Sequence, residues 1–517
     1  MKQIVHALAA PRRGKGRVQR GSALVTALIS LFFVMVIGAG ILAHTMQGLK
    51  LSKRAKTSTA AFNLAESGAE LGLRWLKDQS SPPSGGSAFD PFNGAQSMGG
   101  GTYQVSIIPD PGNAGAVLKT FKVVADGTFA GKIERVELVM KQQSFGKFAY
   151  FTHSETSSIT NGRVWFIPSD RIRGPAHSNN ASASNFQINW GNTGAIFQGM
   201  VTSVANSISY APSNPANEAD YLKVYKTGSQ GYQLGVDVIQ MPSSSDVQKA
   251  AAWGATSGYP GGNGVYTPAN GGIYVVGNSS VVAQVDGSGN QEFAITQGAN
   301  TTTVKVDVQN NRRQWRLNNG SWNTVSGAGT GVLFSTGDIT SLRGTIADNK
   351  LSGSPPSVQY RSATTIATDI NAGRNITLTN NLRYASSPDP NLPTNDVVNL
   401  RPGTLGLMAR NVRIRTGAPQ NMFIDATMLA GSSTTIDGSF YVQDYNTKVP
   451  TGTLRIMGGI IQRNRGPVGT VSNGNLQTGY AKDYYYDPRV ADNPPPFFPT
   501  TGSYDKLSWR RLAVSGN

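Results

Sequence analysis

The sequence predicts two unequal parts: a long N-terminal α-helix on a small antiparallel β-meander, and a much larger all-β domain. Three observations predict this division. Residues 22–43 carry no ionisable side chain, and no proline occurs between residues 22 and 81. The segments 102–109, 121–129 and 132–142 then alternate apolar and polar residues, as half-buried strands do. Beyond them, short apolar runs separated by glycine- and asparagine-containing turns recur to about residue 470.

Composition limits what can hold these parts together. The 517 residues include no cysteine, so packing must replace disulfide bonds in any domain outside the cytoplasm. With four histidines and no cysteine, we expect neither a metal site nor a cofactor. The net charge is +17, and residues 1–21 contribute six cations and no acid. Such a surplus attracts polyanions such as nucleic acid or anionic lipid, or serves only to keep the chain soluble.

The predicted helix spans residues 22–78 and has two different halves. Residues 22–43 would extend about 33 Å as a helix, which matches a bilayer and exceeds the apolar core of a cleavable secretion signal. The basic residues before this run would stay cytoplasmic, placing the bulk of the chain outside. The second half is amphipathic, with apolar residues at helical spacing: Phe62, Ala65, Ala69, Leu73 and Leu76.

The start of this helix resembles a known family. Arg20-Gly21-Ser22 before an apolar helix resembles the class III signal of type IV pilins and pseudopilins, and "AFNLAESGAELGLRWL" (61–76) is similar to minor pilins of the PilX sort. The resemblance implies that residues 1–21 are a leader, that a prepilin peptidase cleaves after Gly21, and that Ser22 is then N-methylated. It also implies that the helix moves from the inner membrane into a pilus core, beside other minor and major pilins.

The fifth position after the expected cleavage site departs from the family pattern. Most pilins carry glutamate there, whereas this chain has Thr26. A carboxylate in an apolar helix is costly unless it is paired, and in the family it is thought to pair with the terminal amine of a neighbouring subunit. Because a terminal subunit has nothing above it to pair with, Thr26 indicates a position at the pilus tip.

The remaining boundaries follow composition. Residues 79–143, which include a Pro/Gly/Ser-rich loop, form the meander that completes an α+β pilin domain. For residues 144–470 we favour a β-solenoid, since the strands are short, the corners contain Gly or Asn, and no helices are expected between the units. A β-sandwich is the alternative, because its strand spacing is the same. The Tyr/Pro-rich residues 471–517 are expected to cap the all-β domain.

The all-β half carries a second resemblance. "GPAHSN" (174–179), "RGPVG" (465–469) and "GYAKDYYYDPRVADNPPPFFP" (479–499) resemble a domain attached to pilin-like N-termini in the Deinococcus–Thermus group. The whole layout is similar to competence pilins of that group, in which a β-solenoid is inserted in a pilin fold. The resemblance implies a DNA receptor at the pilus tip.

The sequence offers little to support catalysis. Acidic residues in the all-β half are scattered, and no nucleophile elbow lies between a strand and a helix. His177 is the one residue of a catalytic type in a motif, and we interpret it as a hydrogen-bonded turn histidine. We therefore expect that the protein is not an enzyme.

Candidate DNA-binding residues are cations, with aromatic side chains between them. Strand periodicity turns Val412 and Ile414 inward and the flanking arginines outward. If the arginines at 413/415 and 463/465 lie on adjacent rungs, they form a stripe; the alternative is an ordinary solvated face. The candidates are Arg312, Arg313, Trp315, Arg316, Trp322, Arg413, Arg415, Arg455, Arg463, Arg465 and Lys482.

Together these features predict a minor type IV pilin at the pilus tip that acts as a receptor for duplex DNA in natural transformation. Before assembly it would lie in the inner membrane by one transmembrane helix, and afterwards at the cell surface with its C-terminal bulk outside the cytoplasm. The alternatives are a pilus-tip adhesin and a structural minor pilin that primes pilus assembly.

Overall fold

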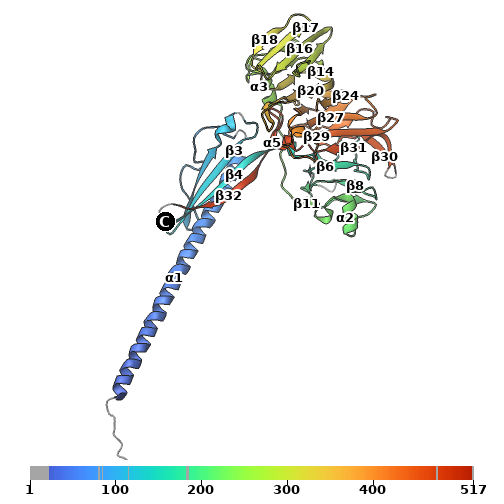
Figure 1. The fold of residues 1–517 in the computed structure, drawn as a ribbon. Helices are drawn as coiled ribbons and strands as arrows, with labels where there is room; N and C mark the ends of the chain where they lie inside the picture. The colour runs from blue at the N-terminus through green and yellow to red at the C-terminus, as the bar shows by residue number, and fades with distance from the viewer. Residues whose placement is uncertain are drawn as a thin grey trace, which may run out of the picture.

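Figure 1 shows the computed structural model, which describes residues 22–79, 82–83, 85–114, 116–181, 186–472 and 475–514. A long helix, α1 (Ser22–Lys77), leads into a small antiparallel sheet and then a large all-β region, as the sequence predicts. The sheet has the order β1-β2-β3-β4-β32, with bounds Gln96–Met98, Gly101–Pro109, Thr120–Phe129, Lys132–Ser144 and Thr500–Leu512. The predicted leader, residues 1–21, lies outside the described residues.

α1 divides into a free half and a packed half. The first buried residue is Ala61, and from there the helix lies on β2, β3 and β4. Gly72 allows a close approach, since a Cβ there would lie 2.8 Å from Val123 and 2.9 Å from Val105. The N-terminal half extends away from the rest of the protein (Figure 1), and its most apolar window is 0% buried. It is long and apolar enough to cross a membrane, which is consistent with anchoring.

The large region is built from parallel ladders. The first runs in the order β13-β19-β23-β25-β27-β29-β5-β7-β9-β11, with bounds Ile273–Val276, Val332–Ser335, Ala363–Thr368, Thr404–Ala409, Met422–Ala430, Gly452–Asn464, Tyr150–Ser154, Ala176–Ser178, Val201–Ser203 and Tyr232–Leu234. The second is β14-β20-β24-β26-β28 (Ser279–Val285, Ile339–Ile346, Ile376–Tyr384, Val412–Ile414, Phe440–Val442). The third continues from β29 through β31 (Asn475–Tyr485) to β6 (Arg171–Arg173).

Further short strands and helices lie beside these ladders or connect their strands. Antiparallel strands β15 to β18 extend β14 into a distal sheet, with bounds Gln291–Gln297, Asn300–Asp307, Arg312–Leu317 and Asn323–Ser326. The other short strands are β8 (Gln187–Asn189), β10 (Ser209–Ala211), β12 (Gly264–Tyr266), β21 (Lys350–Ser352), β22 (Ser357–Tyr360) and β30 (Gly469–Ser472). The short helices are α2 (Glu218–Val224), α3 (Asp246–Trp253), α4 (Val397–Leu400), α5 (Arg489–Asp492), η1 (Pro111–Ala114), η2 (Phe145–Lys147) and η3 (Gly228–Gln230). Five of these helices, α2, α3, α4, η2 and η3, lie within residues 144–470 and correct the expectation that no helices occur between the units there.

The register of the ladders explains the core. In the second ladder Ile376 lies over Val412 and Val412 over Phe440, and all three are buried. Val412 and Ile414 are both 0% exposed, so the inward direction predicted for them is confirmed. Apolar side chains at equal positions of successive strands thus form continuous columns, which supply the core that a chain without disulfide bonds requires.

A polar ladder runs beside these columns at one corner. Asp338 donates its N–H to Asn278 Oδ1 at 2.8 Å, and its own Oδ1 accepts the N–H of Asn375 at 2.8 Å. Asn411 Nδ2 donates to Asn375 Oδ1 at 2.9 Å, and Asn411 Oδ1 accepts the N–H of Ser439 at 2.9 Å. These bonds satisfy backbone groups at corners where the chain leaves one ladder for the next.

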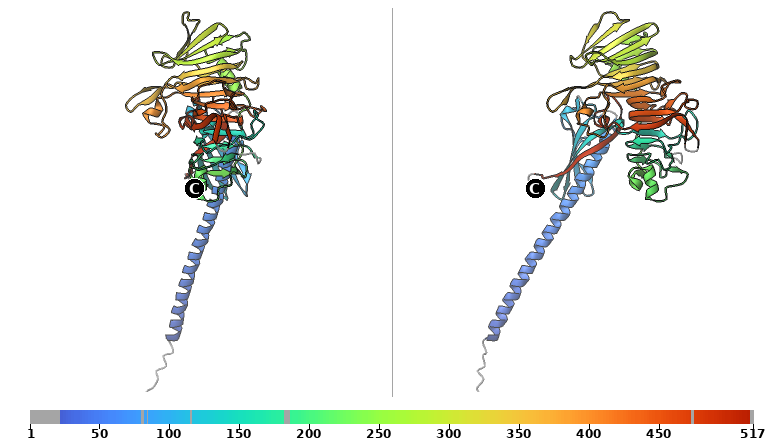
Figure 2. Two further views of the ribbon diagram at one scale, coloured as in Figure 1. Left: turned by 90° about the vertical axis from the view of Figure 1, so that its right-hand side faces the viewer. Right: turned by 45° about the vertical axis from the view of Figure 1, so that its right-hand side comes forward.

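The three parallel ladders together form one pile of strands, which we call the stack. The chain enters the stack in its middle. β5 follows the small sheet directly and lies between β29 and β7. The strands after β5 build one end, residues 235–263 run to the other end, and the strands from β13 to β29 build back to β5. Figure 2 shows this as a colour order, from yellow-green at the top through orange and red to teal and green below.

The C-terminal segment divides between the two parts. Tyr480 and Tyr484 on β31 are buried in the stack, whereas β32 pairs antiparallel with β4 in the small sheet. This corrects the expectation that residues 471–517 form one capping segment. Without β32, β4 would expose an edge beside α1.

The raised pKa of Asp425, on β27, should make the free energy of unfolding depend on pH. Burial raises its pKa to about 6, Asp487 acts in the same direction, and the Tyr384 N–H, Arg383 and Arg489 oppose the shift. Because the folded pKa exceeds the ordinary 3.8, the native state binds the proton more tightly. The stabilisation from this group is therefore complete below pH 3.8 and is lost as the pH rises through about 6.

We expect Asp425→Asn, which cannot ionise, to raise the free energy of unfolding at pH 7 by at most about 3 kcal/mol. Urea unfolding at pH 7 and at low pH measures the difference, which should vanish at low pH. The exposed Asp237→Asn is the control and should behave as wild type at both pH values. Equal stabilities of the Asp425 variant and wild type at pH 7 would contradict the assignment.

Candidate nucleic-acid interface

Three of the cations predicted to bind DNA are buried in the structure. Arg465 is 2% exposed, and its Nη1 lies 2.8 Å from Oε2 of Glu155, which is fully buried. Its guanidinium lies 3.7 Å from the centroid of the Phe166 ring. Glu155 and Phe166 belong to the segment that follows β5, whereas Arg465 follows β29. Arg465 therefore links the two halves of the stack, and the prediction that it contacts DNA is wrong.

Lys482 has a similar structural role. It is 9% exposed, and its Nζ lies 2.5 Å from Oδ2 of the buried Asp170. Burial lowers the pKa of Lys482, while the attraction of Asp170 opposes the shift. Since β31 carries Lys482 and Asp170 directly precedes β6, this pair also joins segments far apart in the sequence. Its prediction as a DNA contact is likewise wrong.

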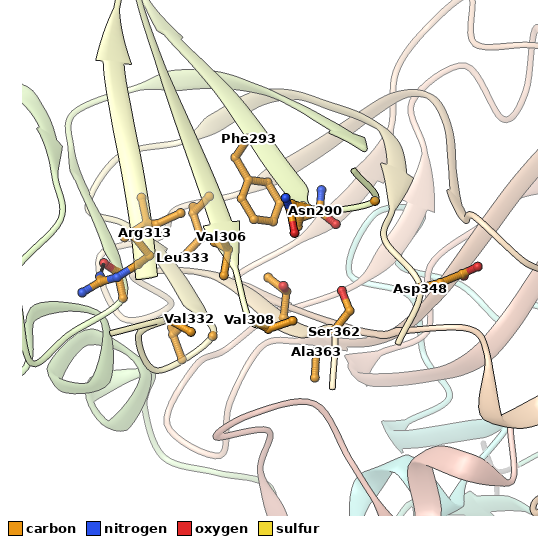
Figure 3. Close-up of a pocket in the computed structure, with 17 residues that line it drawn as sticks. Asn290, Phe293, Val306, Val308, Arg313, Val332, Leu333, Asp348, Ser362 and Ala363 are labelled. Atoms are coloured by element: carbon orange, nitrogen blue, oxygen red, sulfur yellow. Dashed lines mark hydrogen bonds between the residues drawn. The ribbon is translucent and has the colours of Figure 1, made fainter. Parts of the chain in front are cut away.

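Arg313 is buried beneath the distal sheet. It is 1% exposed and donates to the carbonyls of Pro268 at 2.8 Å, Ala269 at 3.1 Å and Gly327 at 3.1 Å, and to that of Gly272. Figure 3 shows it at one side of a mainly apolar pocket between the distal sheet and the stack. Arg313 therefore fastens loops to the distal sheet, and it cannot contact a nucleic acid at the surface.

Acids of neighbouring strands balance much of the positive charge around the rest of the predicted 310–322 patch. Arg312 Nε lies 3.0 Å from Oδ2 of Asp307. Arg316 and Lys305 lie 4.5 and 4.8 Å from the centroid of the Trp322 ring, and Lys305 also pairs with Asp286 at 2.8 Å and Glu292 at 3.2 Å. Trp315 is half-buried against the core. This arrangement leaves little positive charge for phosphates.

Two further candidates are only partly available. Arg455 Nη2 lies 2.9 Å from Oδ2 of Asp483, which also pairs with Arg173, and its guanidinium lies 5.2 Å from the centroid of the Tyr485 ring. Arg463 is half-buried at a corner, where burial lowers its pKa. Because Arg465 is internal, the stripe predicted from 413/415 and 463/465 does not form.

The strands of the second ladder instead carry arginines and no acidic residue. The segments 339–346, 376–384, 412–415 and 440–443 contain four arginines and no Asp or Glu. Arg383 approaches Asp425 at 3.7 Å; the other three are Arg343, Arg413 and Arg415, which we call the basic ladder face. Arg343 and Arg415 are exposed, and no ion pair forms at either among the residues that the structure describes.

Register brings these arginines together. Arg413 lies beside Thr377 in the next strand and donates to its Oγ1 at 2.9 Å. Arg415 donates its N–H to Leu378 O, and Leu378 pairs in turn with Leu342, the neighbour of Arg343. Arg343 and Arg415 are thus two strand spacings apart, about 10 Å. Figure 1 shows β24 on the side of the stack away from the small sheet.

Sequence reasoning missed Arg343. The segment "ITSLRGTI" places it next to the buried Leu342, so alternation alone would have turned it outward. Its neighbours on the face, however, come from strands that only the ladder pairing identifies.

His177 is internal rather than catalytic in position. It lies within β7, not in a turn, and is 1% exposed. Its ring nitrogens lie 2.8 Å from Thr202 Oγ1 and 2.9 Å from Asn179 Oδ1, and its ring stacks on Phe151. Burial lowers the pKa of His177 to about 4, so the ring is neutral at neutral pH.

The expected processing site lies at the edge of the described chain. Gly21 is outside the described residues, and Ser22 is the first residue of α1. Thr26 donates its hydroxyl to Ser22 O at 2.7 Å, so this side chain is satisfied within its own helix. A glutamate at this position would need a partner from another molecule.

The buried pair Arg465–Glu155 yields a test that separates a structural from a binding role. Arg465→Met should leave the buried Glu155 carboxylate without its cation, with only the hydroxyls of Thr152 and Tyr150 still donating to its Oε1, and should lower the free energy of unfolding by about 3–5 kcal/mol. Urea unfolding measures this loss. Arg463→Met, which changes a half-buried arginine two residues earlier, near the end of β29, is the control and should cost much less. Wild-type stability combined with lost DNA affinity in Arg465→Met would restore the original prediction.

Comparisons with known proteins place no family name on the chain. No protein-family model matches it, and no curated protein matches it. A solved structure of the competence-associated pilin ComZ from Thermus thermophilus is similar, with 13% identity over 88% of this chain and 97% of that chain. Its TM-score of 0.29 is too low for the match to support an inference about fold or function.

Proposed function

We propose that the protein is a minor type IV pilin that binds duplex DNA at the pilus tip during natural transformation. The observation that carries the proposal is the division of α1. Its C-terminal half packs on the small sheet, while its N-terminal half is an apolar rod with no partner in the described chain. Such a surface needs lipid before assembly and the helices of other minor and major pilins afterwards.

Processing and position complete the pilin proposal. Prepilin peptidase would cleave between Gly21 and Ser22, and Ser22 would be N-methylated. Thr26 supports a terminal position, because it needs no partner from another subunit. The protein would then move from the inner membrane to the cell surface, with the all-β region outside the cytoplasm.

We further infer that the all-β region is a β-solenoid rather than a sandwich. Support comes from the ten strands of the first ladder, which pair only in parallel with one another. Sandwiches are built from antiparallel sheets. A stack of this kind offers a long, flat side for a linear polymer.

The basic ladder face supports DNA as the ligand. Arginines that no acid neutralises suit phosphate oxygens, and this contact is independent of base sequence. We propose binding rather than catalysis as the role of this face. An adhesin or a structural subunit that primes assembly would not require a row of arginines without ion pairs.

A gel shift with duplex DNA across a salt series tests this proposal. Replacing Arg343, Arg413 and Arg415 together by Gln should weaken binding equally for all sequences and lower the slope of log K against log salt by about 3 at most. Replacing Arg163, Lys226 and Arg401 by Gln removes the same charge from other exposed positions as a control. Equal effects of both variants would indicate non-specific attraction, and no binding at low salt would exclude DNA.

The processing step has its own test. Gly21→Leu should leave an uncleaved precursor in cells, because a side chain at the cleavage position blocks the peptidase in the family that this site resembles. The size of the chain on a denaturing gel is the measurement. Gly14→Leu within the same leader is the control and should be processed normally. If the Gly21 variant is processed normally, Gly21 is not the cleavage site, and α1 would be interpreted as a simple membrane anchor.

A further inference from the structure

A band of cations encircles part of α1 between its apolar run and the small sheet. The band consists of Lys50, Lys53, Arg54 and Lys56, and all four are exposed. Residues 22–65 contain no Asp or Glu, so the band has no acidic partner on its own stretch of helix. Among the described residues, no ion pair or hydrogen bond of these four side chains is found.

The small sheet does not neutralise the band either. The helix meets the sheet just beyond the band, where Ser58 donates to Glu134 Oε1 at 2.6 Å. Glu134 is already paired with Arg511 at 2.9 Å, and Glu137 is paired with Arg510 and Lys122. Among the residues that the structure describes, these two carboxylates of β4 are therefore occupied, and the charge of the band remains available to a partner from outside.

The position of the band matches a membrane surface. From Ser22 to Leu49 the helix contains 28 residues without an Asp, Glu, Lys or Arg side chain. At 1.5 Å per residue this run is about 42 Å long, which equals a bilayer with its headgroup regions. If Ser22 lies at one surface, the band lies among the headgroups of the other.

We infer that the basic band binds anionic phospholipid headgroups and so sets the depth of α1 in the membrane before assembly. This inference rests on the membrane anchoring that we propose above. Long basic side chains keep their stems along the apolar helix and extend the charge to the headgroups, where anionic lipids attract them.

The arrangement favours lipid over an acidic neighbouring subunit. At 100° per residue, the four side chains cover an arc of about 160° around α1. A neighbouring helix contacts a narrow seam, with partners spaced three or four residues apart. Lipids surround a helix on all sides and can therefore engage the whole arc at once.

Electron spin resonance in phosphatidylcholine–phosphatidylglycerol vesicles tests this inference on the chain from Ser22 onward, the form proposed after cleavage, which lacks the six cations of residues 1–21. Spin-labelled versions of each lipid report how strongly it is held at the protein surface. We expect a several-fold preference for phosphatidylglycerol over phosphatidylcholine that weakens with salt. Replacing Lys50, Lys53, Arg54 and Lys56 by Gln should bring the two lipids close to equality.

A charge-matched control variant and the possible outcomes distinguish failure of this inference from failure of the proposed membrane anchoring. Replacing Lys77, Arg163, Lys226 and Arg401 by Gln removes the same charge elsewhere and should retain the preference. Held lipid without a preference, or a preference that survives in the band variant, would overturn this inference alone. If lipid is held without a preference and the band variant also fails to enter pili, the band would instead be assigned to acidic groups of other subunits. No held lipid of either kind would overturn the membrane anchoring as well.

Discussion

The all-β region depends on the pairing of β29 with β5. Their pairing joins the half of the stack that ends at β29 to the half that begins at β5. The buried ion pair beside them, Arg465–Glu155, links residues 310 positions apart in the sequence. Bringing such distant segments together costs chain entropy, which the buried columns of apolar side chains must offset. The ion pair adds selectivity, because a shifted register would leave a buried charge without its partner.

This closure also determines which surfaces remain free. The chain passes from β4 to β5 and returns from β31 to β32, and the two connections meet where the Phe145 N–H donates to Pro499 O at 3.3 Å. The outer side of the first ladder packs against α3 and aromatic residues of the connections, including Phe145 and Phe498. The second ladder has no such cover at Arg343 and Arg415, which is why it is the surface that we assign to a polyanion.

Positive charge serves different purposes along the chain. Arg313, Arg465 and Lys482 are buried and hold distant segments together. Arg312 and Arg455 are balanced by nearby aspartates. Cations without an acidic partner among the described residues form two groups, the basic ladder face and the basic band of α1, and also stand singly, as at Arg163, Lys226 and Arg401. A net charge of +17 therefore says little about where a polyanion binds until each cation has been placed.

The sequence by itself determined the long helix, its two halves, the small antiparallel sheet and the inward direction of Val412 and Ile414. These features follow from local periodicity, which a helix or a strand expresses without help from distant residues. The tertiary structure alone decided that β5 enters the middle of the stack, that β32 returns to the small sheet, and that Arg465 and Lys482 are buried. Each of these depends on pairing between segments far apart in the chain, and alternation shows which side chains share a face but not which strand lies beside it.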